Sequence, residues 1–154
     1  MTLRLAPRFA ALALGAFAVA SQADDAPVVS DAWARATAPG LDVGAAYMVI
    51  QGGDRADRLV AATSERAAMV HVHTVEEQAG VARMRAIDAI EVPARGRVVL
   101  APKSTHLMLM GLTGPLVAGQ SFPITLRFAT AGAQTVIVAV REATAADDPA
   151  QQRH

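Results

Sequence analysis

Short segments in which apolar and polar residues alternate recur along the chain, separated by glycine, proline and charged residues. Such alternation predicts strands, because it places the apolar side chains on one face of a sheet. Turn signals fall roughly every 8–12 residues, which is typical of an all-β sandwich or barrel. The predicted strands are residues 28–35, 43–51, 58–63, 68–74, 81–87, 106–112, 121–129 and 134–142, and short segments at 90–92 and 97–100 lie beside turn signals.

Two stretches are less regular than the rest. Residues 57–70 have a helix as the rival prediction, but neither period is sustained there, and a strand over 58–63 is favoured. Residues 75–80 are acidic and end in glycine, which predicts a connection between two strands. Nothing between the strands is long and periodic enough for a crossover helix, which argues against an α/β sheet.

The two ends of the chain differ in composition from its centre. Residues 1–23 carry Arg4 and Arg8, then an apolar run over 9–20, then small residues up to Ala23. This order predicts a secretory signal peptide rather than a membrane anchor, since the run is shorter than the roughly twenty residues of a span. Residues 143–154 are mostly Ala, Asp, Gln and Pro, which predicts a disordered tail. The folded domain is therefore expected over residues 24–142.

Charge and cysteine content narrow the class of protein. Without Arg4 and Arg8 the exported chain has 12 basic and 14 acidic residues, a net charge of −2. Such a chain has no electrostatic footprint for nucleic acid or for an anionic membrane. The chain has no cysteine, so no disulfide supports the fold and a blue-copper centre, which requires a thiolate, is excluded.

Histidine and methionine gather in residues 71–112. Residues i and i+2 of a strand share a face, so His106 and Met108 are expected to project from the same side, with Leu107 and Leu109 directed into the core. His73 and Met84 lie on strands joined by a short connection and are expected to face each other as a hairpin pair. Thioether and imidazole groups favour a soft, reduced ion such as Cu(I).

Each of these residues also has a simpler interpretation. Methionine is a common filler of hydrophobic cores, so packing remains an alternative to metal binding. His71 is interpreted as a surface or supporting residue, and Met69 and Met110 as packing near the site. The chain shows no nucleophile elbow, no phosphate-binding glycine loop and no HExxH motif, so an enzyme is not expected.

The spacing of the candidate ligands resembles the signature of the periplasmic copper chaperones called the PCu(A)C family. Ten residues separate His73 from Met84, twenty-one separate Met84 from His106, and one separates His106 from Met108. The flanking segments 80–85 and 106–112 agree with that family, as do 31–35, 45–47 and 57–60. The resemblance covers nearly the whole chain after residue 23.

The resemblance implies a single-domain, cupredoxin-like Greek-key β-barrel in the periplasm that binds Cu(I) through His73, Met84, His106 and Met108. It also implies delivery of copper to the CuA centre in subunit II of cytochrome c oxidase, alongside Sco-type thiol proteins. A monomer is expected. Copper buffering or resistance is the alternative within the same chemistry. A β-sandwich interaction module without metal is the alternative from another class.

Overall fold

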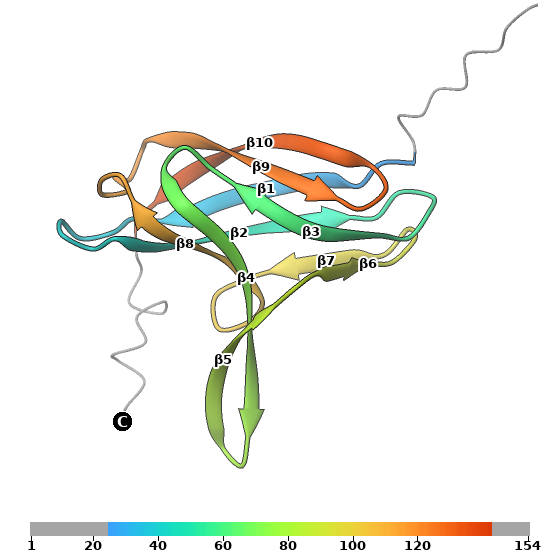
Figure 1. Cartoon of the computed structure of the whole chain (residues 1–154), viewed down its shortest axis with the longest axis horizontal. Helices are drawn as coiled ribbons and strands as arrows, with labels where there is room; N and C mark the ends of the chain where they lie inside the picture. Colours follow the sequence, from blue (N-terminus) through green and yellow to red (C-terminus); the bar gives the residue numbers. More distant parts are fainter. Residues whose placement is uncertain (1–24, 143–154) are drawn as a thin grey trace, which may run out of the picture.

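The computed structural model describes residues 25–142, which form ten strands and no helix (Figure 1). The predicted signal peptide and tail lie outside these residues. The strands are β1 Val28–Arg35, β2 Val43–Gln51, β3 Asp57–Thr63, β4 Ala67–Gln78, β5 Val81–Ile87, β6 Ile90–Val92, β7 Arg97–Leu100, β8 His106–Leu112, β9 Ser121–Phe128 and β10 Gly132–Arg141. Each predicted strand is present, and the helical alternative over residues 57–70 is wrong.

Seven of the strands close into a barrel in the order β4, β8, β2, β1, β10, β9 and β3, with β3 returning to β4. Neighbouring strands are antiparallel except β1 and β10, which are parallel. The three remaining strands each pair with one barrel strand: β5 with β4, β6 with β3, and β7 with β2. The prediction of an all-β, cupredoxin-like barrel is confirmed.

Alternation along the strands builds the core. Leu107 and Leu109 of β8 are fully buried, whereas His106 and Met108 occupy the other face of the strand. Met48 of β2 is also part of the core, as predicted. Burying a side chain of this size contributes about 1.5–3 kcal/mol, so these positions fix which face of each strand points inward. The outward face of β8 is thereby left free for polar and thioether groups.

The predicted connection at residues 75–80 is wrong over its first four residues. β4 continues to Gln78, and the turn is made by Ala79 and Gly80, which both have positive φ angles, as a tight type I′ hairpin turn requires. The acidic side chains are tolerated in a strand because this part of β4 pairs only with β5 and projects from the barrel (Figure 1). Arg85 also donates a hydrogen bond to Glu76 across the hairpin.

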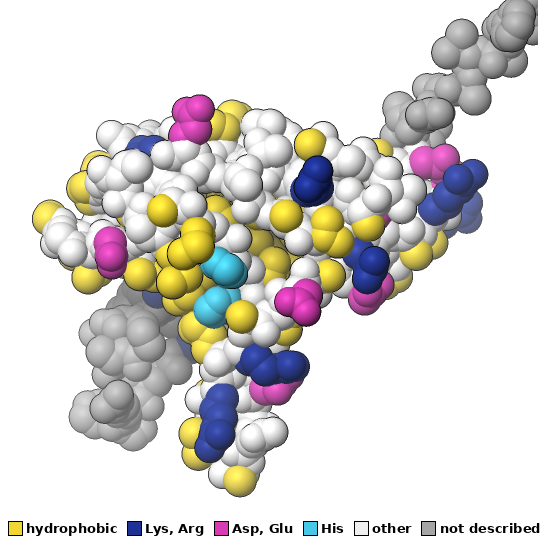
Figure 2. Space-filling view, viewed as in Figure 1, with side chains coloured by type: hydrophobic (Ala, Val, Ile, Leu, Met, Phe, Trp, Pro, Cys, Tyr) yellow, Lys and Arg dark blue, Asp and Glu magenta, His cyan; other side chains and the backbone are white. Residues whose placement is uncertain are grey.

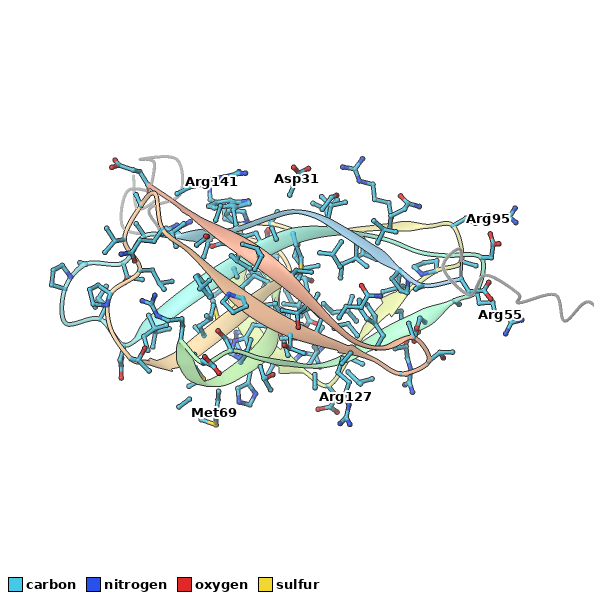
Figure 3. The ribbon with its side chains drawn as sticks, turned by 90° about the horizontal axis from the view of Figure 1, so that it is seen from above. Asp31, Arg55, Met69, Arg95, Arg127 and Arg141 are labelled. Atoms are coloured by element: carbon cyan, nitrogen blue, oxygen red, sulfur yellow. The ribbon has the colours of Figure 1, made fainter. Side chains whose placement is uncertain are left out.

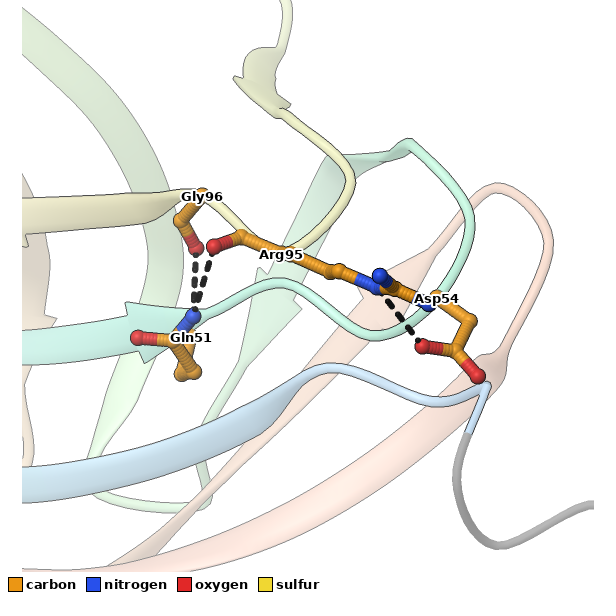
Figure 4. A network of polar contacts seen from close by, with 4 residues as sticks. All are labelled: Gln51, Asp54, Arg95 and Gly96. Carbon is orange, nitrogen blue, oxygen red and sulfur yellow. Dashed lines mark hydrogen bonds and ion pairs between the residues drawn. The ribbon is translucent and has the colours of Figure 1, made fainter.

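One end of the barrel is fixed by close backbone approach. A Cβ atom on Gly52 would lie 2.0 Å from the carbonyl oxygen of Pro93, so only glycine fits there. The Gln51 side-chain amide donates to the carbonyl oxygens of Arg95 and Gly96 at 3.1 and 3.0 Å (Figure 4). The Arg95 guanidinium in turn donates to Asp54 at 3.1 Å. These contacts attach the turn before β7 to the end of β2.

Asp57, at the start of β3, supports the same end of the barrel. Its carboxylate accepts backbone N–H groups of Arg58, Thr130 and Ala131, each at 2.8 Å. Burial raises the pKa of this carboxyl, but the three backbone hydrogen bonds outweigh burial and hold the pKa below its ordinary value. In Figure 3, Arg55 and Arg95 lie toward this end, whereas Met69 and Arg141 lie toward the other. No helix among residues 25–142 is long and apolar enough to cross a membrane.

Candidate metal centre

Two histidines meet on the outer face of the barrel where the β4–β5 hairpin leaves it. His73 on β4 lies directly opposite His106 on β8, and their ring centroids are 6.1 Å apart. Directly opposite residues of an antiparallel pair share a face, so the two imidazoles project to the same side. Figure 2 shows histidine side chains among hydrophobic ones at this junction.

The orientation of the His106 ring is set by its own turn. His106 is 5% exposed, and its Nδ1 lies 2.9 Å from the carbonyl oxygen of Ser104. A carbonyl oxygen only accepts, so Nδ1 is the donor, and in the neutral form of the ring Nε2 is the nitrogen that carries the free lone pair. The turn is held by the Ser104 N–H donating to the carbonyl of Ala101. A hydrogen bond between the Thr74 and Thr105 hydroxyls, 3.0 Å long, attaches it to β4.

His73 has the opposite arrangement. Its Nδ1 is buried and has no hydrogen-bond partner among residues 25–142. Burial lowers the pKa of His73, and the neighbouring His106 and His71 lower it further. The ring is therefore neutral at neutral pH and offers an unpaired nitrogen lone pair. A buried polar atom without a partner costs free energy, which a bound ion would recover.

The two predicted methionine ligands lie beside this histidine pair. Met108 follows His106 on the same face of β8, and Met84 comes from β5. Both line a groove of about 750 Å³ that His106 also lines, so three of the four predicted ligands face one open space. Met84 is 53% exposed.

The predicted direct pairing of His73 with Met84 is wrong. Met84 lies opposite Val75, and Ala86 lies opposite His73. The cause is the length of β4: because the strand continues to Gln78, the register of the hairpin is shifted by two residues from the expected one. Met84 and His73 still share a face, as diagonal neighbours rather than as a directly opposed pair.

His71 and the remaining methionines surround these four residues. His71 is exposed, as predicted, and its ring centroid lies 6.4 Å from that of His73. It pairs directly with Met108 across β4 and β8. Met110 is partly buried, whereas Met69 is 53% exposed. Met69 therefore lies outside the core, and its predicted role of packing near the site stays a prediction.

An aromatic row that the sequence analysis did not assign to the site supports His106. The Tyr47 ring centroid lies 6.3 Å from that of His106, and the Trp33 ring lies 4.5 Å beyond Tyr47. The guanidinium of Arg141 covers the Trp33 ring at 5.3 Å. The row limits the space into which the His106 ring could rotate. Its sequence signal is that the only Trp and the only Tyr lie on adjacent predicted strands.

The available donors limit which ion would fit here. Within residues 25–142, no three His, Asp or Glu side chains gather closely enough to hold a metal ion. A site at this junction would therefore combine imidazole nitrogen with methionine sulfur. Such neutral, soft donors match Cu(I) rather than Mg²⁺ or Ca²⁺, which prefer oxygen.

Fold and site together define a cupredoxin-like domain of the PCuAC type, and solved structures agree. The copper-bound PCuAC domain from PmoF2 is 29% identical, with a TM-score of 0.65 over 76% of this chain and 93% of that one. The Cu(I) form of DR1885 from Deinococcus radiodurans is 31% identical, with a TM-score of 0.63 over 80% of this chain and 83% of that one. The predicted PCu(A)C relationship is thus confirmed.

By its sequence the chain belongs to the family of LpqE-like putative lipoproteins, whose model matches residues 28–140. A putative lipoprotein of Leifsonia xyli subsp. xyli, Lxx21020, is 34% identical over 126 residues, which is 80% of this chain and 75% of that protein. The family model covers β1 to β10 almost completely, and so includes every strand that carries a candidate ligand.

Proposed function

We propose that this protein is an exported, non-catalytic Cu(I) carrier that holds the ion with His73, Met84, His106 and Met108. The observation that carries the proposal is the His73–His106 pair, in which each ring has a nitrogen free to bind. Met84 and Met108 add soft sulfur donors on the same face. Copper in the related PmoF2 domain and Cu(I) in DR1885 support this choice of ion.

The exposure of the site favours a carrier over an enzyme. Met84 is half exposed and shares an open groove with His106 and Met108, so the ligands of another protein can approach a bound ion. Thioethers are neutral ligands that an acceptor displaces one at a time, and such an exchange changes no oxidation state. Methionine also cannot be lost to a disulfide in an oxidising compartment, in contrast to a pair of cysteines.

We place the protein in the periplasm and propose the CuA centre in cytochrome c oxidase subunit II as its acceptor, with Sco-type thiol proteins as co-workers. The support is the PCuAC relationship together with the predicted signal peptide over residues 1–23. The lipoprotein description of its relative also fits an exported, envelope-associated protein. If the protein delivers copper to no acceptor, its function is copper buffering.

The ligand set is tested by anaerobic competition with a chromophoric Cu(I) chelator. The variants are His106→Ala and Met108→Ala, and each should bind Cu(I) far more weakly while remaining folded. Met48→Leu is the matched control, because it removes a buried thioether from the core and should leave the affinity unchanged. Unchanged affinity in both site variants would refute the assignment. X-ray absorption of the copper-loaded protein should show both nitrogen and sulfur, and no sulfur shell would support the interaction module instead.

Delivery is tested separately from binding. The copper-loaded protein is mixed with the apo CuA domain of subunit II, and formation of the CuA spectrum is followed with and without a Sco-type protein. Formation of that spectrum at a rate that depends on the carrier supports delivery. Retention of copper by a carrier that binds it tightly would favour buffering.

A further inference from the structure

The outer face of the β4–β8 pair carries histidine or methionine at three successive cross-strand positions. His73 faces His106, His71 faces Met108, and Met69 faces Met110. The register between these two strands has no bulge, so all six side chains lie on one face. The proposed Cu(I) site uses only the first of these pairs, together with Met108 and Met84. It leaves three soft donors without a role.

We propose that Met69, His71 and Met110 form a second, weaker site for a soft monovalent ion, next to the first. The choice of Cu(I) as its natural ion rests on the proposed function. Directly opposite residues have Cβ atoms about 4.5–5.5 Å apart, and residues i and i+2 lie about 6.5–7 Å apart along the strand. At these spacings, flexible methionine side chains can converge on one ion with the imidazole of His71.

Packing does not account for this group. Met69 is 53% exposed, and the core of β4 is built by Ala67 and Val72. Figure 3 shows the Met69 side chain at the edge of the molecule, directed away from the barrel. His71 is likewise exposed. A single exposed methionine is ordinary, but here Met69 lies two residues before the exposed imidazole of His71, and Met110 lies diagonally across from it on β8. The three side chains together supply three soft donors on one face.

The two sites would be adjacent, but their ligands would be held in place to different degrees. The ring centroids of His71 and His73 are 6.4 Å apart, and Met108 lies between His106 and Met110 along β8. The first site has a buried His73 nitrogen without a partner and a fixed His106 ring, whereas the second has exposed donors with no such preparation. Preorganised ligands bind more tightly, so the first site should fill before the second.

The inference is tested by anaerobic titration with Cu(I), supplied as its acetonitrile complex, and with Ag(I) nitrate as a redox-inert substitute. The methionine methyl groups are followed by NMR. The first equivalent should shift Met84 and Met108, and the second should shift Met69 and Met110. The triple variant Met69→Leu, His71→Gln, Met110→Leu should keep the first step and lose the second, because all three proposed ligands of the second site are replaced.

Two controls make the result specific. Met48→Leu should retain both steps, because Met48 lies in the core. His154→Gln should do the same, because His154 is the one histidine that is not a proposed ligand of either site.

Three results would overturn the second site. They are Met69 and Met110 methyl groups that do not shift, methyl groups that shift together with the first equivalent, and a triple variant that binds like the parent. If Met84 and Met108 shift as expected in any of these cases, the proposed function stands without the second site. If they do not shift, the proposed function fails independently.

Discussion

Asp57 and His73 are both polar side chains with atoms withdrawn from solvent, yet their surroundings differ. The Asp57 carboxylate accepts three backbone hydrogen bonds at one end of the barrel. The buried Nδ1 of His73, at the base of the hairpin, has no partner within residues 25–142. A fully satisfied group holds its surroundings together, whereas an unsatisfied one adds nothing to stability until something binds. Hydrogen bonding alone therefore distinguishes the end of the barrel, which Asp57 stabilises, from the base of the hairpin, where His73 is available for binding.

The largest expected effect comes from removing the unsatisfied group. His73→Leu should lower Cu(I) affinity by more than about 100-fold, because a direct ligand should cost more than the 10–100-fold typical of supporting residues. The free energy of unfolding of the metal-free protein should not fall, since no hydrogen bond of the Nδ1 atom is lost. Chelator competition and urea denaturation measure the two quantities. A clear loss of stability in the metal-free His73→Leu variant would show that His73 stabilises the fold, contrary to this expectation.

Removing the satisfied group should have the opposite pattern. Asp57→Ala leaves the N–H groups of Thr130 and Ala131 without their acceptor, at a cost of about 2 kcal/mol in the free energy of unfolding. Cu(I) affinity should remain that of the parent protein, because the carboxylate lies away from the site. Urea denaturation with Asp54→Ala as control separates the effect from general loss of surface charge. Equal stability of Asp57→Ala and Asp54→Ala would refute this role.

His73 and Asp57 should also change the free energy of unfolding in different pH ranges. The folded-state pKa of His73 is below 6.5, so the unfolded chain takes up this proton first and metal-free stability falls as the pH drops below about 6.5. The folded-state pKa of Asp57 is below 3.8, so its contribution is complete above that value and is lost as the pH falls through the lower folded value. The free energy of unfolding is measured by denaturation across pH 3–8. His73→Leu should remove the loss of stability below about pH 6.5, and Asp57→Asn should remove the loss at lower pH.

The smallest effect is expected from a polar pair that is exposed on both sides. Arg85 and Glu76 pair across the β4–β5 hairpin with side chains 63% and 44% exposed. Glu76→Gln should change the free energy of unfolding by less than about 0.5 kcal/mol, because water screens and replaces the interaction. Thermal unfolding in low and high salt checks this. A larger loss would mean that the hairpin, rather than the barrel, limits stability.

The periodicity of the sequence was sufficient for the fold class and for the face on which His106 and Met108 lie. Both follow from local alternation, since Leu107 and Leu109 fix the inward face of β8. The length of β4 was not predictable in the same way. Glu76 and Glu77 resemble a solvated loop when the chain is considered alone, and their strand conformation depends on pairing with Arg83 and Ala82.

Details of the site that depend on contacts between distant segments were also missed. The hydrogen bond from His106 to the Ser104 carbonyl needs the turn geometry, and the approach of Tyr47 to His106 needs the order of strands in the barrel. The absence of a partner for the His73 nitrogen is a property of the packed structure. Spacing indicated which residues to consider, and tertiary packing determined their hydrogen bonding and exposure.

The two-residue turn at Ala79–Gly80 has a consequence for how this domain tolerates insertions and deletions. Beyond the cross-strand pair Val75–Met84, the hairpin consists only of the paired residues 76–78 and 81–83 and the turn. Adding or removing one residue from each side of this segment would leave Met84 opposite Val75. The ten-residue gap between His73 and Met84 is therefore a matter of hairpin length rather than of coordination chemistry. By contrast, a single-residue insertion between His71 and His73 would reverse the face of one of them.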